Sequence, residues 1–350
     1  MSLPAGAPVL PAVTVLVPPT SPSKPAQPAA SHSAAPRPTR QTPATHASNA
    51  HTHEHDIGHG RLAQLQPISW PIAIAIGGMH LLALAAPFTF TWSGVVVLVM
   101  LWWLTLGLGI CLCYHRLLTH RSFKTFKWVE YAISALACTS WQGSPAHWVG
   151  THRLHHKHSD GEDDPHTPHH GFSWAHATWM LRKDPPGFDP RGAAKDLMRD
   201  PVHAWLDRHH AWTVVILAVI LAAGGYAVGG WFTAASWVVW GVALRITLGY
   251  HCTWLVNSAA HTWGYQSHNT GDDSRNNWWV AMLSFGEGWH NNHHAEQRAA
   301  AHGRAWWEFD VTYLTIRAMK AVGLAWDVVP ARRPVGGDVI ADRPHDDTGN

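Results

Sequence analysis

The sequence predicts an all-α integral membrane protein with four transmembrane helices in two hairpins and a helical cap on the cytoplasmic side. Three observations support this class. Apolar segments long enough to cross a bilayer occur in two pairs, the chain contains 22 tryptophans, and a histidine triplet of identical spacing follows each pair. Tryptophan is favoured at membrane surfaces, where its ring bridges apolar and wet layers. The 46% hydrophobic content of the 350 residues suffices for one large core.

The four spans are expected at about 70–86, 93–113, 212–228 and 231–250. A helix rises about 1.5 Å per residue, so about 17 to 21 residues approach the thickness of a hydrocarbon core of about 30 Å. Core helices of a soluble protein are the weaker alternative.

The positions of basic residues predict the orientation of these spans. The links within the two pairs carry no Lys or Arg, and the basic residues lie at the opposite ends of the spans. The positive-inside rule therefore places both termini and the cap in the cytoplasm. In a bacterial cell this corresponds to the inner or plasma membrane. The relevant basic residues are Arg116, Arg121, Lys124, Lys127 and Arg208. Arg245 lies inside the fourth span, near its cytoplasmic end, and is expected to snorkel.

Composition divides the chain into a membrane domain, residues 63–330, and two tails. The N-terminal tail, residues 1–62, is rich in Pro, Ala and His and is expected to be disordered, and residues 331–350 should form a flexible tail. The net charge of +2, without long basic runs, argues against nucleic-acid binding. Dinucleotide, phosphate-loop and nucleophile-elbow motifs are absent, and four cysteines without a Cys-x-x-Cys pair indicate buried thiols.

Two histidine triplets share the spacing zero, three, four. On a helix, residues three and four apart lie on one face, so each triplet presents three imidazoles to one side. A single triplet could be only a polar helix in a histidine-rich protein, but the repetition favours metal binding. The triplets are His152, His155 and His156, and His290, His293 and His294.

Further candidate ligands lie at the cytoplasmic ends of the second and fourth spans. Asn257 and His261 are one helical turn apart. His115 and His120 are five residues apart, about 140° around a regular helix, and without a break or a π-bulge they would serve two different ions. Nine histidines and one asparagine exceed what one ion binds, which predicts a two-metal site. Its place beside a membrane, without a cofactor motif, indicates redox chemistry on a lipid.

The histidine motifs and Asn257-x3-His261, with Gly286 to Glu287 before the last triplet, resemble the membrane fatty acyl desaturases of the delta-9 (stearoyl-type) family over about residues 65–328. The bacterial and plant acyl-lipid branch is the most similar. The resemblance implies a diiron centre. One iron is expected to bind His115, His156, His261 and His294, with Asn257 acting through a water. The other is expected to bind His120, His152, His155, His290 and His293.

The resemblance also implies an acyl tunnel whose bend is lined by Gln142, Trp148, Thr253 and Trp254. Interfacial anchoring is the alternative role for the two tryptophans. For the closed end of the tunnel, which sets chain length, Val99, Trp103 and Gly107 are candidates because they recur every four residues on the second span. Glu287 and Asp160 are expected to orient imidazoles, unless they are ordinary surface acids.

The expected activity is O2-dependent desaturation, in which O2 is co-substrate and is reduced to two waters while a cis double bond forms at position 9 of a saturated acyl chain. No heme-binding or ferredoxin motif occurs in the chain, so electrons are expected from a separate ferredoxin or cytochrome with its reductase. Gly150-Thr151 replaces the Arg-Asp pair of animal acyl-CoA desaturases, which leaves CoA or a glycerolipid as the carrier. A membrane diiron hydroxylase and a metal transport or storage protein are the alternatives.

Overall fold

The computed structural model describes residues 59–332, which are mostly helical. The one sheet among them has two strands, in which β1 (Lys124–Thr125) pairs antiparallel with β2 (Ala325–Trp326). Helix α1 (His59–Leu65) starts inside the expected N-terminal tail. The rest of that tail, and the expected C-terminal tail beyond residue 332, lie outside the described residues.

Two long apolar helical segments dominate the fold. In the first, Trp92–Thr119, helix α3 (Trp92–Trp102) continues directly into η2 (Trp103–Thr119), which has π-helical geometry. The second, Pro201–His261, comprises α9 (Pro201–Val238), the π-helical η5 (Val239–Leu244), α10 (Arg245–Ser258) and the short η6 (Ala259–His261). The segments have 28 and 61 residues, and the mean hydropathy of their most apolar 18-residue stretches is 2.5 and 2.2, so both are long and apolar enough to cross a membrane.

Helix α2 (Trp70–Ala83) is also apolar but has only 14 residues. Its length is therefore about 21 Å, less than a hydrocarbon core of about 30 Å. The turn η1 (Ala86–Thr89) separates it from α3.

Helix α9 reverses direction within its length at two glycines. Gly229 and Gly230 leave helical geometry, and Gly230 has a φ of 73°, a conformation that favours glycine. A Cβ at Gly225 would lie 2.8 Å from the Cα of Ala234, so the two halves of α9 pack closely beside the turn. This reversal lies where the sequence placed the link between the third and fourth spans.

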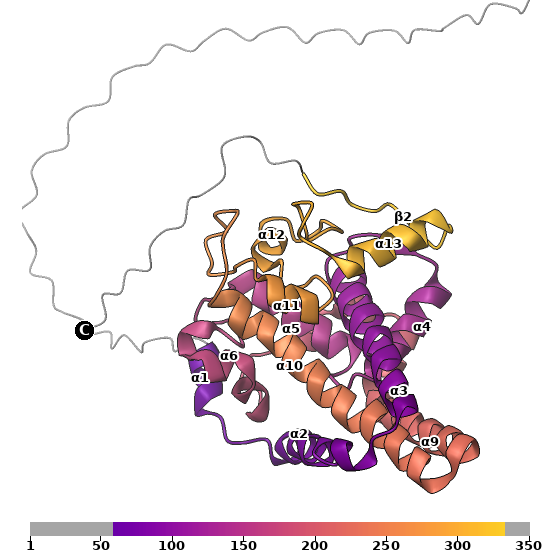
Figure 1. Cartoon of the computed structure of the whole chain (residues 1–350). Coiled ribbons are helices and arrows are strands. Elements are labelled where there is room, and N and C mark those ends of the chain that lie inside the picture. The colour runs from indigo at the N-terminus through magenta and orange to yellow at the C-terminus, as the bar shows by residue number, and fades with distance from the viewer. Residues whose placement is uncertain (1–58, 333–350) are drawn as a thin grey trace, which may run out of the picture. The chain divides into compact units, whose positions relative to one another are not determined.

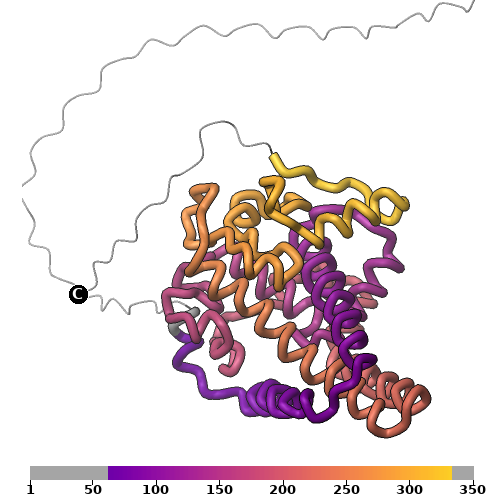
Figure 2. Tube along the Cα trace, viewed as in Figure 1, coloured from indigo at the N-terminus to yellow at the C-terminus, as the bar shows by residue number. Residues whose placement is uncertain are grey.

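The remaining helices gather around the ends of the long segments. Figures 1 and 2 show the C-terminal helices α11, α12 and α13 at one end of the described structure and α2 at the other. Before the second long segment lie α4 (Lys127–Cys138), α5 (Pro145–His158), η3 (Pro168–His170), α6 (Phe172–His176), η4 (Thr178–Leu181), α7 (Pro190–Ala193) and α8 (Lys195–Met198). After it lie α11 (Trp278–Leu283), α12 (His290–Ala295) and α13 (Val311–Ala321).

The main core surrounds η2, whose side chains from Thr105 to Thr119 are almost all buried. Helices α4, α5 and α13 pack against it. Because η2 is enclosed on several sides, polar groups at its C-terminal end can be held in fixed positions away from water.

Arg245 does not snorkel, contrary to the expectation. It is 1% exposed and donates hydrogen bonds to the Gly241 carbonyl (2.6 Å), the Thr105 hydroxyl (2.7 Å) and the Thr139 carbonyl (2.7 Å). Two of these acceptors come from segments more than 100 residues away in the sequence. The tertiary structure therefore supplies acceptors that the isolated span did not reveal.

Candidate metal centre

Five histidines converge at the C-terminal end of η2. One nitrogen from each lies within 4.8 Å of the others, and the members are His115, His120, His152, His156 and His293. The Nε2 atom of His293 lies 3.1 Å from that of His115 and 2.9 Å from that of His156. Helices η2, α5 and α12 thus contribute to one five-histidine cluster.

A second group, the four-histidine cluster, lies beside the first. Its members are fully buried and are His155, His261, His290 and His294. The Nε2 atom of His290 is 3.0 Å from that of His261 and 3.1 Å from that of His294. All nine predicted histidines therefore fall into two adjacent groups.

The grouping of the histidines in space differs from the expected division between two irons. His115 and His156 belong with His120, His152 and His293, and His155 and His290 belong with His261 and His294. Helix geometry explains the difference. Residues four apart on a helix differ by only about 40° in direction. The last two histidines of each triplet are adjacent in the sequence and differ by about 100°. In each triplet the first and last histidines therefore share a cluster, and the middle one turns to the other.

His115 and His120 lie in the same cluster, unlike the arrangement expected for a regular helix, because η2 is π-helical. The main-chain N–H of His120 donates to the carbonyl of His115 at 3.2 Å, an i to i+5 contact. Five residues make about one turn of such a helix, so both rings face the same side. Their centroids are 4.8 Å apart.

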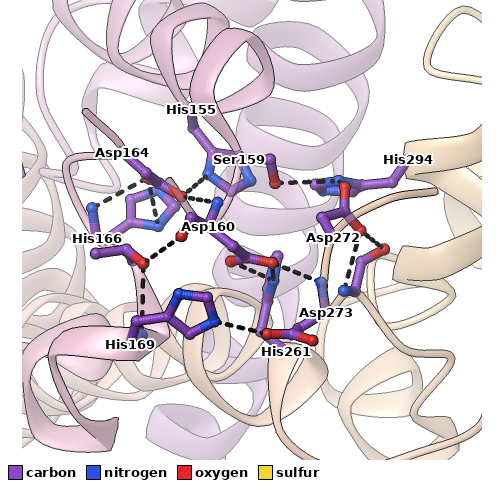
Figure 3. Close-up of polar contacts among 12 residues, drawn as sticks. His155, Ser159, Asp160, Asp164, His166, His169, His261, Asp272, Asp273 and His294 are labelled. Atoms are coloured by element: carbon purple, nitrogen blue, oxygen red, sulfur yellow. Dashed lines mark hydrogen bonds and ion pairs between the residues drawn. The ribbon is translucent and has the colours of Figure 1, made fainter. Parts of the chain in front are cut away.

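Carboxylates lie behind four of the imidazoles. The Nδ1 of His115 is 2.6 Å from Glu287, and those of His155, His261 and His294 lie 2.9, 3.0 and 2.7 Å from Asp164, Asp160 and Asp272. Figure 3 shows Asp164, Asp160 and Asp272 beside three members of the four-histidine cluster, His155, His261 and His294. A carboxylate that accepts from Nδ1–H leaves the lone pair on Nε2, the nitrogen directed into the cluster.

The protonation states fit metal binding. Burial and neighbouring imidazoles lower the pKa of His152, His156, His290 and His293 well below the usual value, so these rings are neutral. Burial alone would raise the pKa of Asp272, but His294 lowers it well below the ordinary range and keeps it ionised.

The chain matches the family model described as fatty acid desaturase over residues 90–323, two thirds of its length. The chain belongs to the fatty acid desaturase family.

Similar proteins include several curated desaturases. The chain is 47% identical over 263 residues, 75% of this chain and 94% of the relative, to an sn-1 stearoyl-lipid 9-desaturase of Anabaena variabilis. It is 44% identical over 266 residues, which are 75% of this chain and 90% of the relative, to an sn-2 palmitoyl-lipid 9-desaturase of Nostoc. It is 42% identical over 260 residues, which are 73% of this chain and 78% of the relative, to an acyl-CoA 5-desaturase of Anemone leveillei. The predicted family is confirmed, and the chain is a fatty acid desaturase, an oxidoreductase.

The donor set of this desaturase fits a pair of metal ions. Two ligands at right angles, each about 2.1 Å from one ion, are about 3.0 Å apart. The closest Nε2 pairs within the two clusters are 2.9 to 3.1 Å apart, and all ligand nitrogens of a cluster lie within 4.8 Å of one another. Imidazole is a good ligand for iron, and the carboxylates behind the rings add negative charge near the cations.

A cavity leads to the histidines of the desaturase. Gln142, Trp148, Thr253 and Trp254 all line it, together with His152 and Asn257. The Thr253 hydroxyl donates to the Gln142 carbonyl oxygen at 3.1 Å. A second, smaller cavity shares Trp148, His152, Thr253 and Asn257 with the first, and also contacts His115 and His290.

The three candidates for the closed end of the tunnel lie elsewhere. Val99 is 53% exposed on α3, and the side chain of Trp103 lies against Gly107. None of the three lines either of the two cavities described above. From the same span, Leu106 and Ile110 line the smaller cavity instead.

Several residues of the site were missed in the sequence. Arg116 is fully buried, and its guanidinium binds Glu287 (3.0 Å) and Asp310 (2.9 Å). His302 Nδ1 lies 3.1 Å from the same Glu287 carboxylate. Asp164 and Asp272 were missed as well. Asp164 lies nine residues after His155, but no spacing rule in the sequence links His302 or Asp310 to the histidine motifs.

Proposed function

We propose that this desaturase introduces a cis double bond at position 9 of a saturated acyl chain carried on a glycerolipid. The observation that carries the proposal is the shared lining of the two cavities. Trp148, Thr253 and Asn257 line both, and the smaller cavity reaches His115 of one cluster and His290 of the other. An alkyl chain held there would present its methylenes beside both metal-binding clusters.

We infer that the two ions are iron. His115, His120, His152, His156 and His293 would hold one of them. His155, His261, His290 and His294 would hold the other, with Asn257 acting through a water. When bound, the iron pair supplies, with O2 and two electrons, the oxidation that removes two hydrogens from unactivated methylenes and yields two waters.

The protein's own groups orient and enclose this chemistry. The four carboxylates fix which ring nitrogen carries hydrogen, and Trp148 packs 5.1 Å from His152 and 6.2 Å from His115, measured between ring centroids. Gln142 is held between Thr253 and the Gly249 carbonyl, which keeps a polar group fixed in the wall. Fixed walls are required because neighbouring methylenes differ only in position.

The charges of the larger cavity favour a glycerolipid over CoA. Arg182 and Asp184 are its charged lining residues, and the Arg182 guanidinium already donates to the Gln66 carbonyl at 2.9 Å. One cation accompanied by one anion offers little attraction to the several phosphates of CoA. The cyanobacterial relatives described above are named for lipid-bound acyl chains.

We further propose that α2, the α3–η2 helix and the two halves of the Pro201–His261 segment form four spans in two hairpins. Exposed apolar side chains such as Val96, Ile216 and Val219 support lipid contact along these helices. The uncharged links and the basic residues at the other ends support cytoplasmic termini and a cytoplasmic active site. Electrons would then come from a cytoplasmic ferredoxin or cytochrome with its reductase.

The test is expression in a host that lacks unsaturated acyl chains, followed by mass spectrometry of fatty acids and lipid classes. We expect a cis-9 monoene that disappears in His293→Ala. After a pulse of labelled saturated precursor, the labelled monoene should appear in glycerolipids before it appears in acyl-CoA. If the labelled monoene appears first in acyl-CoA, the proposed carrier is refuted. A hydroxylated product, or no product with iron and donor present, would refute the proposed reaction.

A further inference from the structure

A second histidine network lies outside the metal centre. His251 on α10 contacts two other imidazoles at once, through Nε2 to His80 Nε2 on α2 (3.2 Å) and through Nδ1 to His176 Nε2 on α6 (3.0 Å). The ends of this histidine chain are also held. His80 Nδ1 lies 2.8 Å from the Ile76 carbonyl, and His176 Nδ1 lies 3.0 Å from the Ser258 hydroxyl. Both nitrogens of all three rings therefore have partners.

The partners orient the ends of the histidine chain. The Ile76 carbonyl only accepts, so His80 Nδ1 carries a hydrogen. At the other end the Ser258 hydroxyl donates its hydrogen to the Trp254 carbonyl at 2.8 Å, which leaves its oxygen to accept from His176 Nδ1. The contacts of the three rings connect side chains of three helices far apart in the sequence.

Trp254 is surrounded by these rings. Its ring centroid lies 5.2 Å from that of His251 and 5.7 Å from that of His176, both edge to face, and 6.3 Å from that of His80, nearly parallel. Tyr250 stacks on it at 5.1 Å. The indole N–H lies 3.0 Å from the Met180 sulfur. Rotation of the indole would therefore displace at least one ring of the histidine chain.

Trp254 also lines the larger cavity beside Thr253, whereas the three histidines are not among the residues that line it. The histidine chain accordingly stands behind a wall residue of the cavity. It belongs to neither metal-binding cluster.

We propose that His80, His251 and His176 are positioning residues that hold Trp254 and thereby select which pair of methylenes reacts. The inference rests on the proposed function, because it takes the cavity to be the acyl site. Neighbouring methylenes are chemically alike, so selection depends on where the wall bends the chain. A displacement of about 1 Å at a reacting centre can change a rate about 100-fold.

The experiment uses the full-length chain in the host without unsaturated acyl chains. His251→Phe keeps a ring but removes both contacts, whereas His80→Phe and His176→Phe remove one end each. His209→Phe is the matched control, because His209 lies on α9 and contacts the carbonyl and ring of Trp205 on its own helix. The measurements are the ratio of double-bond positional isomers, iron per chain and the thermal unfolding temperature.

We expect the ratio of the main isomer to its neighbours to fall about tenfold in His251→Phe and less in the single-contact variants, with iron content unchanged. His209→Phe should keep the wild-type ratio. An unchanged isomer ratio in the variants of His80, His176 and His251 overturns the proposal, even if total activity falls. The proposal is also overturned if none of these three variant proteins accumulates in the host while the control protein does, since the three histidines would then have only a structural role. A wild-type protein that makes no monoene refutes the proposed function instead, and this inference with it.

Discussion

Replacing Glu287 with glutamine tests how the five-histidine cluster is held. The carboxylate is 6% exposed, with one oxygen 2.6 Å from His115 Nδ1 and the other 3.0 Å from the Arg116 guanidinium. Both oxygens therefore accept hydrogens. Glutamine has the same shape but offers one oxygen and one NH2 group, so either His115 or Arg116 would face another donor.

The size of the effect follows from these contacts. A hydrogen bond to a charged group contributes about 1.5–3 kcal/mol. Removing the partner behind a ligating imidazole typically lowers metal affinity about 10- to 100-fold. A tenfold change corresponds to about 1.4 kcal/mol, so the two ranges agree. We expect Glu287→Gln to lower the iron affinity of the five-histidine cluster by this factor and to leave the four-histidine cluster unchanged.

Asp272→Asn provides the reciprocal experiment, because Asp272 lies 2.7 Å from His294 Nδ1. It should weaken the four-histidine cluster alone. The assay is iron per chain during titration with a chelator, with Mössbauer spectra to distinguish the two sites. Asp196→Asn is the control, since this carboxylate pairs with surface arginines. If Glu287→Gln weakens both sites equally, or neither, the grouping of the histidines described above is wrong.

Three further predictions concern packing. Gly150→Ala would place a Cβ against a carbonyl of α7 and should cost at least about 1–3 kcal/mol, whereas Gly77→Ala, with open space around it, should be neutral in thermal unfolding. Ile110→Phe should shift products toward shorter acyl chains because Ile110 lines the smaller cavity, and Val99→Phe should leave the chain-length profile unchanged. Arg245→Ala should lower the free energy of unfolding by about 2–3 kcal/mol, because it removes three hydrogen bonds of the buried guanidinium. An unchanged melting temperature would contradict this prediction.

The identities of the nine histidines were predictable because helical spacing leaves a local pattern. The grouping of each triplet in the structure also follows from helical spacing, because residues four apart differ by about 40° and adjacent residues by about 100°. The position of His120 beside His115 was not predictable, because a π-helix has no clear sequence signal and places five residues in about one turn.

The groups behind the ligands could not be predicted in full, for a different reason. Glu287 and Asp160 were identified as candidates because each lies close to a histidine triplet in the sequence. Arg116 and Asp310 are 194 residues apart, and only the fold brings them together around Glu287. The tunnel wall shows the same limit. The four-residue spacing that favoured Val99 assumed a regular helix, whereas from residue 103 onward the span is π-helical, and Leu106 and Ile110 line the smaller cavity.

The two π-helical segments are linked by Arg245. It directly follows η5, donates a hydrogen bond to the Gly241 carbonyl within that segment, and donates another to the Thr105 hydroxyl near the start of η2. Wide helical turns misalign main-chain acceptors, and buried acceptors need donors. A guanidinium supplies several donors in one rigid group, which suits this position better than lysine would. A residue that would be costly in an isolated apolar helix thus connects η5 with Thr105 of η2 and with the Thr139 carbonyl.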